Sequence, residues 1–128
     1  MVTGQLERTD SCYVLLPHLF VTRAEAAAAC EVVQSGSTLP SIHSHAQNEF
    51  VMDTAVNKEY GDIWLGLQRV NASSFAWQDG SPVEYVAWFG DEPNDTGDCV
   101  YMSFLWSQWR DINCDTAHFF VVCQYKPQ

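Results

Sequence analysis

Ile63-Trp64-Leu65-Gly66-Leu67 is the stretch at which the pattern of this chain changes from helix to strand. The run is short and apolar, and its length and ring content are those of a buried strand. The segment before it begins with Ser44-His45-Ala46-Gln47, which matches a capping box. Helical spacing continues from there to about Lys58, with apolar residues at Phe50, Val51 and Ala55. The sequence therefore predicts a helix and then a strand.

Another helix is predicted nearer the N-terminus, at residues 23–33. Four consecutive alanines precede Cys30, and alanine is the best helix former. Thr22 is placed to cap the free amides of the first turn.

The rest of the chain predicts short strands and a long loop. Phe75-Ala76-Trp77-Gln78-Asp79-Gly80-Ser81-Pro82 is a strand that runs into a turn, because Asp-Gly accepts the positive backbone angles of tight turns. Residues 87–113 contain long irregular stretches, and Phe119-Phe120-Val121-Val122-Cys123 closes the chain as a strand. Two helices followed by several short strands indicate an α+β fold.

Length and composition indicate one folded unit, which we assign to residues 1–128. A chain of 128 residues falls in the size range of a single domain. It is 47% hydrophobic and contains five tryptophans, so it is too apolar to be a disordered segment.

The charge of the chain excludes several classes of partner. Acidic residues outnumber basic ones 16 to 6, which gives a formal net charge of -10. This charge repels nucleic-acid phosphates and anionic lipid headgroups, so we expect no nucleic-acid binding. No apolar stretch approaches the roughly 20 residues that span a membrane, so no membrane insertion is expected either. The carboxylates either cover a solvated surface or gather in part around a cation such as calcium.

Five cysteines point to an oxidising compartment. They stand at positions 12, 30, 99, 114 and 123, without a Cys-x-x-Cys pair, and the four histidines lack metal-ligand spacing. Two disulfides and one leftover cysteine are therefore expected, in a secreted or extracellular protein. Cys99 and Cys114 can anchor the long loop, although the sequence alone leaves the connectivity open.

An ordered set of landmarks runs along most of the chain. The set begins with Cys30 in the alanine-rich helix, Leu39-Pro40-Ser41-Ile42-His43-Ser44, Trp64-Leu65-Gly66-Leu67, and Trp77 with Asp79-Gly80-Ser81-Pro82. It continues with Trp88, Glu92-Pro93-Asn94, Cys99, Trp109-Arg110-Asp111, Cys114 and Phe120-Val121-Val122-Cys123. Over about residues 12–125 this set resembles the C-type lectin-like domains. The resemblance implies two helices packed on short antiparallel sheets, with a long disulfide-anchored loop. It also implies that Cys30 pairs with Cys123 and Cys99 with Cys114.

Cys12 is then the odd cysteine. In relatives with a longer N-terminal hairpin, this position pairs with an earlier cysteine, which this chain lacks. Cys12 is therefore expected to be unpaired in a monomer, or to link two copies as a disulfide-bonded dimer.

The candidate binding site lies in Glu92-Pro93-Asn94-Asp95-Thr96-Gly97-Asp98-Cys99 together with Trp109-Arg110-Asp111. Calcium takes six to eight oxygen ligands, and this segment concentrates carboxylate and amide oxygens. In sugar-binding relatives, a cis proline directs the flanking Glu and Asn at a calcium ion, and two sugar hydroxyls replace its waters. The Glu-Pro-Asn order is similar to that of relatives that prefer mannose, glucose or fucose.

Two departures from the family pattern put the calcium site in doubt. The loop is short, which leaves Asp98 as the only acid near the loop cysteine, and Arg110 stands where an Asn ligand is expected. The predicted metal ligands are Glu92, Asn94, Asp98 and Asp111, and the same residues with Arg110 make the predicted carbohydrate site. Arg110 either pairs with Glu92 or Asp98 in place of the metal, or turns to solvent.

Two further features of the sequence concern the candidate site, namely an auxiliary calcium site found in some relatives and two possible glycosylation acceptors. Arg69 and Ser73 occupy places where acids form an auxiliary calcium site in some relatives, so that site is expected to be absent. Asn94-Asp95-Thr96 and Asn71-Ala72-Ser73 both match glycosylation acceptors, and Asn71 is the better candidate.

The tryptophans divide into two groups. Three lie in apolar, strand-like runs and are expected to pack in the core, namely Trp64, Trp77 and Trp88. Trp106 and Trp109 lie near the long loop and have a better claim to surface contact.

These patterns favour a secreted glycan-binding module that depends on calcium, with mannose-type preference and a role in immune recognition. Its partners are then glycans or glycoproteins. The alternative is a calcium-independent module on the same scaffold that binds a protein, such as a cell-surface receptor. No nucleophile elbow or pair of catalytic carboxylates is recognisable, so an enzyme is not expected.

Overall fold

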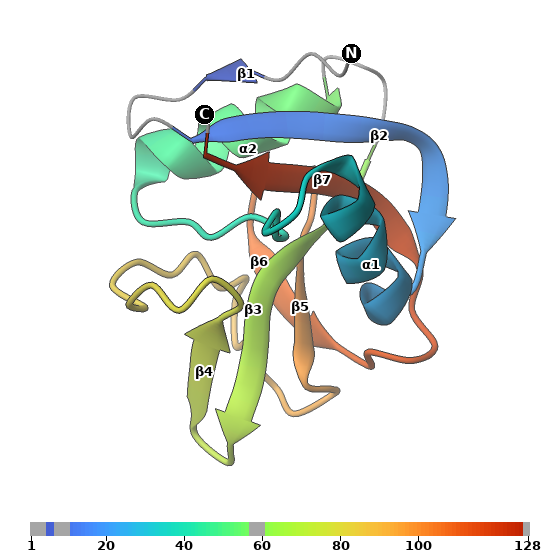
Figure 1. Cartoon of the computed structure of the whole chain (residues 1–128). Helices are drawn as coiled ribbons and strands as arrows, with labels where there is room; N and C mark the ends of the chain where they lie inside the picture. Colours follow the sequence, from blue (N-terminus) through green and yellow to red (C-terminus); the bar gives the residue numbers. More distant parts are fainter. Residues whose placement is uncertain (1–4, 7–10, 57–60, 127–128) are drawn as a thin grey trace.

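The computed structural model describes residues 5–6, 11–56 and 61–126, and within them the fold is α+β as predicted. In Figure 1 the two helices lie beside the two long strands at the top of a twisted sheet. The elements follow in the order β1 (Gln5–Leu6), β2 (Cys12–Val21), α1 (Arg23–Val33), α2 (His45–Val56), β3 (Ile63–Asn71), β4 (Ser74–Trp77), β5 (Cys99–Met102), β6 (Trp109–Ile112) and β7 (Phe119–Tyr125).

Both helices begin where their capping residues predict. At α1, the Glu25 carboxylate accepts hydrogen bonds from the backbone N–H of Thr22 at 3.1 Å and from its hydroxyl at 3.0 Å. At α2, the backbone N–H of Gln47 donates to the Ser44 hydroxyl at 3.1 Å. The predicted end of this second helix, at Lys58, lies outside the described residues.

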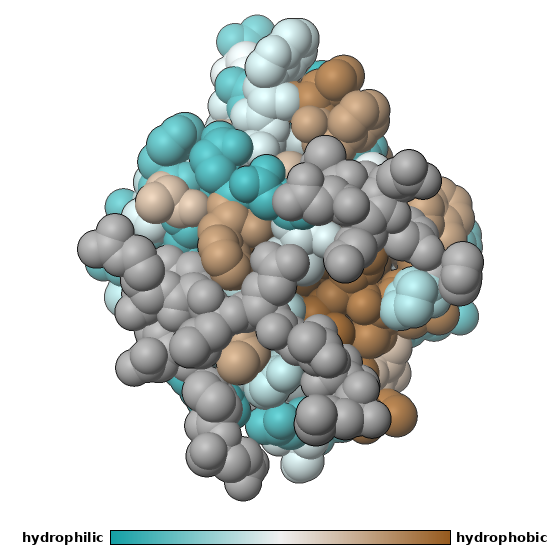
Figure 2. Space-filling view, turned by 90° about the horizontal axis from the view of Figure 1, so that it is seen from above, coloured by the Kyte–Doolittle hydropathy of each residue, from teal (hydrophilic) through white to brown (hydrophobic). Residues whose placement is uncertain are grey.

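The strands form one mixed sheet in the order β1-β2-β7-β3-β5-β6, with β4 paired to β3. The prediction of separate antiparallel sheets is therefore refined, because β3 pairs in parallel with β7 and joins the two halves. Figure 1 shows β2 and β7 side by side across the top, with the hairpin of β3 and β4 extending below. Seen from above, hydrophobic surface lies exposed among hydrophilic side chains (Figure 2).

The prediction of long irregular stretches at residues 87–113 missed two strands. Cys99–Met102 and Trp109–Ile112 are only four residues long and pair with each other in antiparallel register. Strands this short show too few alternations for a pattern to identify them, so their pairing with each other and with β3 decides.

Aromatic side chains fill the core. Trp64 and Trp77 are buried and Trp88 is half-buried, as predicted. Trp109 is fully buried, so the prediction of surface contact is wrong for this residue. Its indole N–H donates to the Asn48 side chain at 2.9 Å, and its ring meets the edges of Trp77, Tyr85 and Trp88.

Two disulfides join distant parts of the chain. Cys30 of α1 is bonded to Cys123 of β7, and Cys99 of β5 is bonded to Cys114. These are the pairs that the resemblance implies. Cys12 is free and half-buried at the start of β2, opposite Tyr125. Neither described helix has the length and hydropathy needed to cross a membrane.

Candidate functional site

The loop that carries the candidate site contacts β6, where the hydroxyl of Thr96 donates to the backbone oxygen of Asp111 at 2.8 Å. The Glu92–Pro93 peptide bond is cis, and Asp95 has a positive φ of 65°. Gly97 packs so closely against β6 that a Cβ there would lie 2.0 Å from the backbone carbon of Ile112. Only glycine fits at this position, and this close approach sets the loop against the strand that carries Asp111.

Asp111 is the centre of the site. Its side chain is 0% exposed. Its Oδ1 accepts hydrogen bonds from the backbone N–H of Asn94 at 3.2 Å and from the hydroxyl of Thr96 at 3.0 Å. The backbone N–H of Asp111 donates to Oε1 of Glu92 at 3.3 Å. The structure therefore brings together Glu92, Asn94 and Asp111 through direct contacts.

Arg69 of β3 supplies the positive charge of the site. One of its terminal nitrogens, Nη2, lies 3.2 Å from Oδ2 of Asp111 and 3.2 Å from Oδ1 of Asp95. Its Nε lies 3.3 Å from Oδ1 of Asp98. Asp98 is thus linked to Asp111 through the guanidinium. One cation is shared by three carboxylates, from the loop and from β6.

The Arg69 side chain is fixed from several directions and is only 12% exposed. Its Nη1 donates to the backbone oxygen of Ala72 at 3.0 Å, and its guanidinium carbon lies 4.6 Å from the centre of the Phe75 ring. Its backbone N–H donates to the backbone oxygen of Asp98 at 2.8 Å. Arg69 therefore belongs to the packed structure of the hairpin, where its charge is partly shielded from water.

The prediction for Arg110 left two alternatives open, a pair with Glu92 or Asp98 and a turn to solvent. Asp98 pairs with Arg69. Burial raises the pKa of Glu92, and the positive charge of Arg110 opposes this rise, so Arg110 acts on one of its two predicted partners. The guanidinium of Arg110 lies over the ring of Phe89, at 4.1 Å from its centre. The cation that contacts Asp95, Asp98 and Asp111 thus comes from β3, while Arg110 packs on Phe89 of the long loop and acts on Glu92.

Burial and close contact shift the acidities of the two neighbouring carboxyl groups in opposite directions. Burial raises the pKa of Glu92 above its usual value, and the adjacent Asp111 carboxylate raises it further. Burial alone would also raise the pKa of Asp111, but hydrogen bonds from Glu92, Asn94 and Thr96 lower it overall. Of these two carboxyl groups, Asp111 is therefore the one that stays ionised more readily.

These contacts do not fit a calcium site of the family type. The predicted oxygen ligands on Glu92 and Asp111 accept hydrogen bonds within the protein, and Oδ1 of Asn94 accepts one from the backbone of Thr96. The guanidinium of Arg69 contacts Asp98 and Asp111 directly, where it would repel a divalent cation. Over residues 5–6, 11–56 and 61–126, no group of three His, Cys, Asp or Glu side chains is arranged to hold a metal ion.

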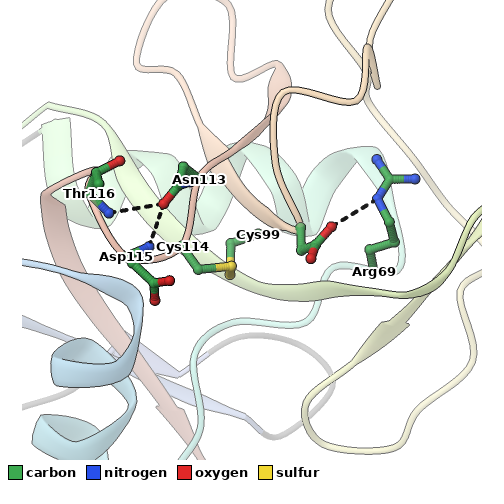
Figure 3. Close-up of a disulfide and its surroundings, with 7 residues drawn as sticks. Arg69, Cys99, Asn113, Cys114, Asp115 and Thr116 are labelled. Carbon is green, nitrogen blue, oxygen red and sulfur yellow. Dashed lines mark hydrogen bonds and ion pairs between the residues drawn. A yellow bond between two sulfur atoms is a disulfide. The ribbon is translucent and has the colours of Figure 1, made fainter.

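The Cys99–Cys114 disulfide fixes the strand that follows the candidate site, because Cys99 is the first residue of β5. Figure 3 shows the Cys99–Cys114 bond between Arg69 on one side and the turn of Asn113 to Thr116 on the other. In that turn, the Asn113 side chain accepts backbone hydrogen bonds from Asp115 at 2.8 Å and from Thr116 at 3.1 Å. The end of the long loop is therefore held to the sheet by two contacts, the Cys99–Cys114 disulfide and the ion pair of Asp98 with Arg69.

A separate cavity of about 400 Å³ lies elsewhere, between the end of β7 and the turn after β4. His43 meets the Ser81 hydroxyl at 3.0 Å and the Glu84 carboxylate at 3.2 Å beside it. The lining groups are Ser11, Ser41, His43, Gln47, Asp79, Gly80, Ser81, Gln124 and Lys126. None of the predicted site residues is among them.

Sequence reasoning missed two contributors to the site, Arg69 and Phe89. Thr96 and Asp95 lay within the predicted segment, but no role was assigned to them. The signal for Arg69 was its position, where the family resemblance expects an acid. A cation in that place, close to several acids in the fold, changes the chemistry of the whole site.

Comparisons with known proteins agree with this fold. The family model described as the lectin C-type domain matches residues 21–125. The low affinity immunoglobulin epsilon Fc receptor of Mus musculus is 40% identical over 104 residues, which are 78% of this chain and 30% of that protein. The chain thus spans less than a third of that relative's length.

Two solved structures are similar over nearly the whole chain. A calcium-independent type II antifreeze protein has a TM-score of 0.83 and 27% identity, covering 98% of this chain and 94% of the other. The cow C-type carbohydrate-recognition domain of CD23, solved in the presence of a GlcNAc2Man3 oligosaccharide, has a TM-score of 0.80 and 26% identity, covering 98% and 99%. Domains of this family are non-enzymatic modules that bind glycans or proteins. This chain belongs to the C-type lectin domain family.

Proposed function

We propose that this domain is an extracellular recognition module that binds its ligand without calcium. The observation that carries this proposal is the guanidinium of Arg69, which contacts Asp95, Asp98 and Asp111 at 3.2 to 3.3 Å. Arg69 contacts two of the predicted metal ligands, Asp98 and Asp111, together with the neighbouring Asp95. The long loop is then ordered by the protein itself.

The ligand that we infer is a protein with basic residues, such as a cell-surface receptor. The long-loop face, which we define as residues 82–98, exposes four acidic residues beside two apolar ones. They are Glu84, Asp91, Asp95 and Asp98, with Val83 and Val86. Asp95 and Asp98 contact Arg69, and Glu84 contacts His43, but these carboxylates remain exposed to a partner. Acidic side chains around apolar contacts favour a basic protein surface. The names of two relatives agree in kind, because one is an Fc receptor and another is calcium-independent.

A second candidate function is calcium-dependent binding of mannose-type glycans through Glu92, Asn94, Asp98 and Asp111, with Arg110 at the edge. It is favoured by the close approach of Glu92 and Asp111, whose contact raises the pKa of Glu92. Two carboxylates this close are a partial ligand set for a divalent cation. The CD23 domain solved with an oligosaccharide is the relative that supports this candidate. For this function Arg69 would have to leave Asp111.

Calorimetry distinguishes the two candidates. Calcium is titrated to about 10 mM into protein stripped with EDTA, because extracellular calcium modules bind in the range of about 0.1 to 1 mM. Methyl α-mannoside is then titrated into the same sample. The proposal predicts no calcium heat and no sugar heat for the wild-type protein.

Two variants sharpen the result. Arg69→Gln removes the central cation, and Arg110→Asn restores the amide that the family pattern expects. Calcium binding that appears only when both substitutions are combined would support replacement of the metal by Arg69. Calcium binding by the wild-type protein, with sugar heat that is lost in Glu92→Gln, would sink the proposal and establish the glycan candidate.

Three further assignments are part of the same proposal. The two disulfides support an extracellular location, since such bonds persist in oxidising compartments. Asn71 is exposed at the hairpin between β3 and β4, which suits a glycan that leaves the long-loop face open. Cys12 is half-buried beside Tyr125, and we expect it to stay a free thiol in a monomer.

A further inference from the structure

Three consecutive hydrophobic side chains are exposed in the turn between β5 and β6. Phe104 is 51% exposed, Leu105 is 53% exposed and Trp106 is 75% exposed. We call these three residues the apolar tip. Single exposed apolar residues are common on proteins, but a contiguous group of large ones typically marks an interaction site.

The apolar tip is held in a defined shape. The backbone N–H of Phe104 donates to the Asp62 side chain at 2.9 Å, and that of Ser103 donates to the Gln108 oxygen at 2.8 Å. The Asn48 side chain donates to the backbone oxygen of Ser107 at 2.7 Å. A surface that is already ordered loses little conformational entropy when it binds.

The backbone of the tip is strained in a way that displays the tryptophan. Trp106 has a φ of 66° and Ser107 a φ of 54°, both in the left-handed region that favours glycine. Ser107 is 4% exposed, so it lies inside while Trp106 points outward. Such a conformation is rarely adopted by residues with a side chain, and it persists because the neighbouring contacts impose it.

Acidic side chains lie beside the apolar tip. Asp62 bonds to the backbone of Phe104, and Glu49 accepts a hydrogen bond from the Ser107 hydroxyl at 3.4 Å. Asp53 is exposed one helical turn after Glu49 on α2. The lysine and arginine side chains that the structure describes lie elsewhere: Arg23 starts α1, Arg69 and Arg110 are at the candidate site, and Lys126 bonds to Ser11. His45 lies 3.8 Å from Glu49 and adds a positive charge only when it is protonated.

The tip is separate from the candidate site. Met102, just before the tip, pairs with Ile63 at the first residue of β3. Arg69 lies six residues further along the same strand, which corresponds to roughly 20 Å. Binding at the tip therefore does not depend on the function proposed for the long-loop face.

We propose that the apolar tip is a docking surface for a basic, amphipathic segment of a partner protein. Its apolar side chains contact Phe104, Leu105 and Trp106, and its Lys or Arg side chains pair with Asp62, Glu49 and Asp53. Tryptophan at the centre of an interface commonly contributes a large share of the binding energy. The neighbouring acidic side chains select basic segments over acidic ones and over anionic membranes.

Two synthetic peptides of one amphipathic pattern, one built from Leu and Lys and one from Leu and Glu, test the proposal. Each carries a fluorophore, and binding is measured by anisotropy. The Leu/Lys peptide is expected to bind the wild-type protein at least about tenfold more tightly than the Leu/Glu peptide. The double variant Leu105→Ser with Trp106→Ser is expected to weaken Leu/Lys binding about tenfold.

Matched variants separate the tip from the general acidity of the chain. Glu49→Gln with Asp62→Asn keeps the hydrogen-bond acceptors, and it is expected to weaken Leu/Lys binding about threefold. Val32→Ser removes an apolar residue that is 86% exposed on α1, and Asp115→Asn removes an exposed acid far from the tip. Both controls are expected to leave binding unchanged, and urea midpoints show that every variant is folded.

Three outcomes would overturn the proposal. One is Leu/Lys binding that is equal in the wild-type protein and the Leu105→Ser, Trp106→Ser variant. Another is flotation with phosphatidylcholine vesicles that depends on the tip, which would make it a membrane contact. The third is a dimer in sedimentation experiments that dissociates in the same variant, which would make the tip an interface between copies of this chain.

Discussion

The helix-bearing half of the molecule and the long-loop end are stabilised by different kinds of contact. In the first, α1, α2, β2 and β7 surround fully buried apolar side chains, and Cys30–Cys123 links helix to sheet. At the loop end, polar contacts dominate, with Arg69 and Asp111 at their centre. Apolar packing tolerates many sequences of suitable size, whereas the loop end depends on one guanidinium. A single substitution can therefore change the chemistry of the site without changing the fold.

The two disulfides should give the largest difference between these regions. Cys30–Cys123 closes a loop with a sequence separation of 93, and Cys99–Cys114 one with a separation of 15. Replacing the first pair by serine is expected to lower the free energy of unfolding by about 4 to 5 kcal/mol, and the second by about 3 kcal/mol. Urea unfolding at equal m-values measures both. A larger loss for the second pair would contradict the view that the first holds the core.

The next difference between the two regions lies in how closely their glycines pack against neighbouring backbone. A Cβ at Gly97 would lie 2.0 Å from backbone atoms of Ile112, and one at Gly66 would lie 2.9 Å from the Leu39 oxygen. Gly97→Ala is expected to cost about 3 kcal/mol or more, and Gly66→Ala about 1 to 2 kcal/mol. Gly80→Ala is the control, because its φ is +81° but its surroundings are open, so it should cost about 1 kcal/mol. Equal urea midpoints for Gly97→Ala and Gly80→Ala would show that the loop is not pressed against β6.

The two arginines of the loop end should differ in their effect on stability. Arg69→Gln leaves the buried carboxylate of Asp111 without its cation and is expected to cost about 2 kcal/mol. Arg110→Gln removes a stacking contact on Phe89 and is expected to cost less than about 1 kcal/mol. Thermal unfolding of both variants measures the difference. If Arg110→Gln were the more damaging, the site would have been assigned to the wrong arginine.

The smallest expected effect is a pH-dependent gain from Glu92→Gln. The raised pKa of Glu92 means that its ionised form fits the folded chain less well than the neutral form. Below pH 4.5 the residue is neutral in both states, and the penalty appears as the pH rises through 4.5 and the raised folded value. Glu92→Gln should therefore be slightly more stable than the wild-type protein at pH 7, with no difference near pH 4. Unfolding curves across this range measure it, and a loss of stability at pH 7 would contradict it.

Local patterns were sufficient to predict part of this structure. The helix at Arg23–Val33 was confirmed because four alanines and a capping threonine act within one segment. The strand beginning at Ile63 was also confirmed, because the apolar run that predicts it lies within one segment, although the strand extends to Asn71. The strands Cys99–Met102 and Trp109–Ile112 were missed because each is defined by its partner strand and not by its own pattern.

The candidate site was harder to predict because its residues are brought together from distant parts of the chain. Asp111 stands 42 positions after Arg69, and no periodicity links them. The resemblance showed that Arg69 stands where some relatives have an acid, and it predicted from this only that an auxiliary calcium site is absent. That its guanidinium turns towards Asp95, Asp98 and Asp111 depends on the packing of the hairpin on Phe75 and on the close approach of Gly97 to β6.

The central claim, that Arg69 occupies the place of a metal ion, is tested most directly by NMR of the arginine side-chain Nε–H groups. The Nε of Arg69 lies 3.3 Å from Oδ1 of Asp98, and the side chain is only 12% exposed, so its N–H is expected to give a resolved signal that exchanges slowly with water. If Arg69 occupies the place of the metal, this signal stays unchanged when calcium is added to about 10 mM. Saturable movement or loss of the signal, together with shifts of the Asp98 and Asp111 amides, would show that calcium displaces the guanidinium.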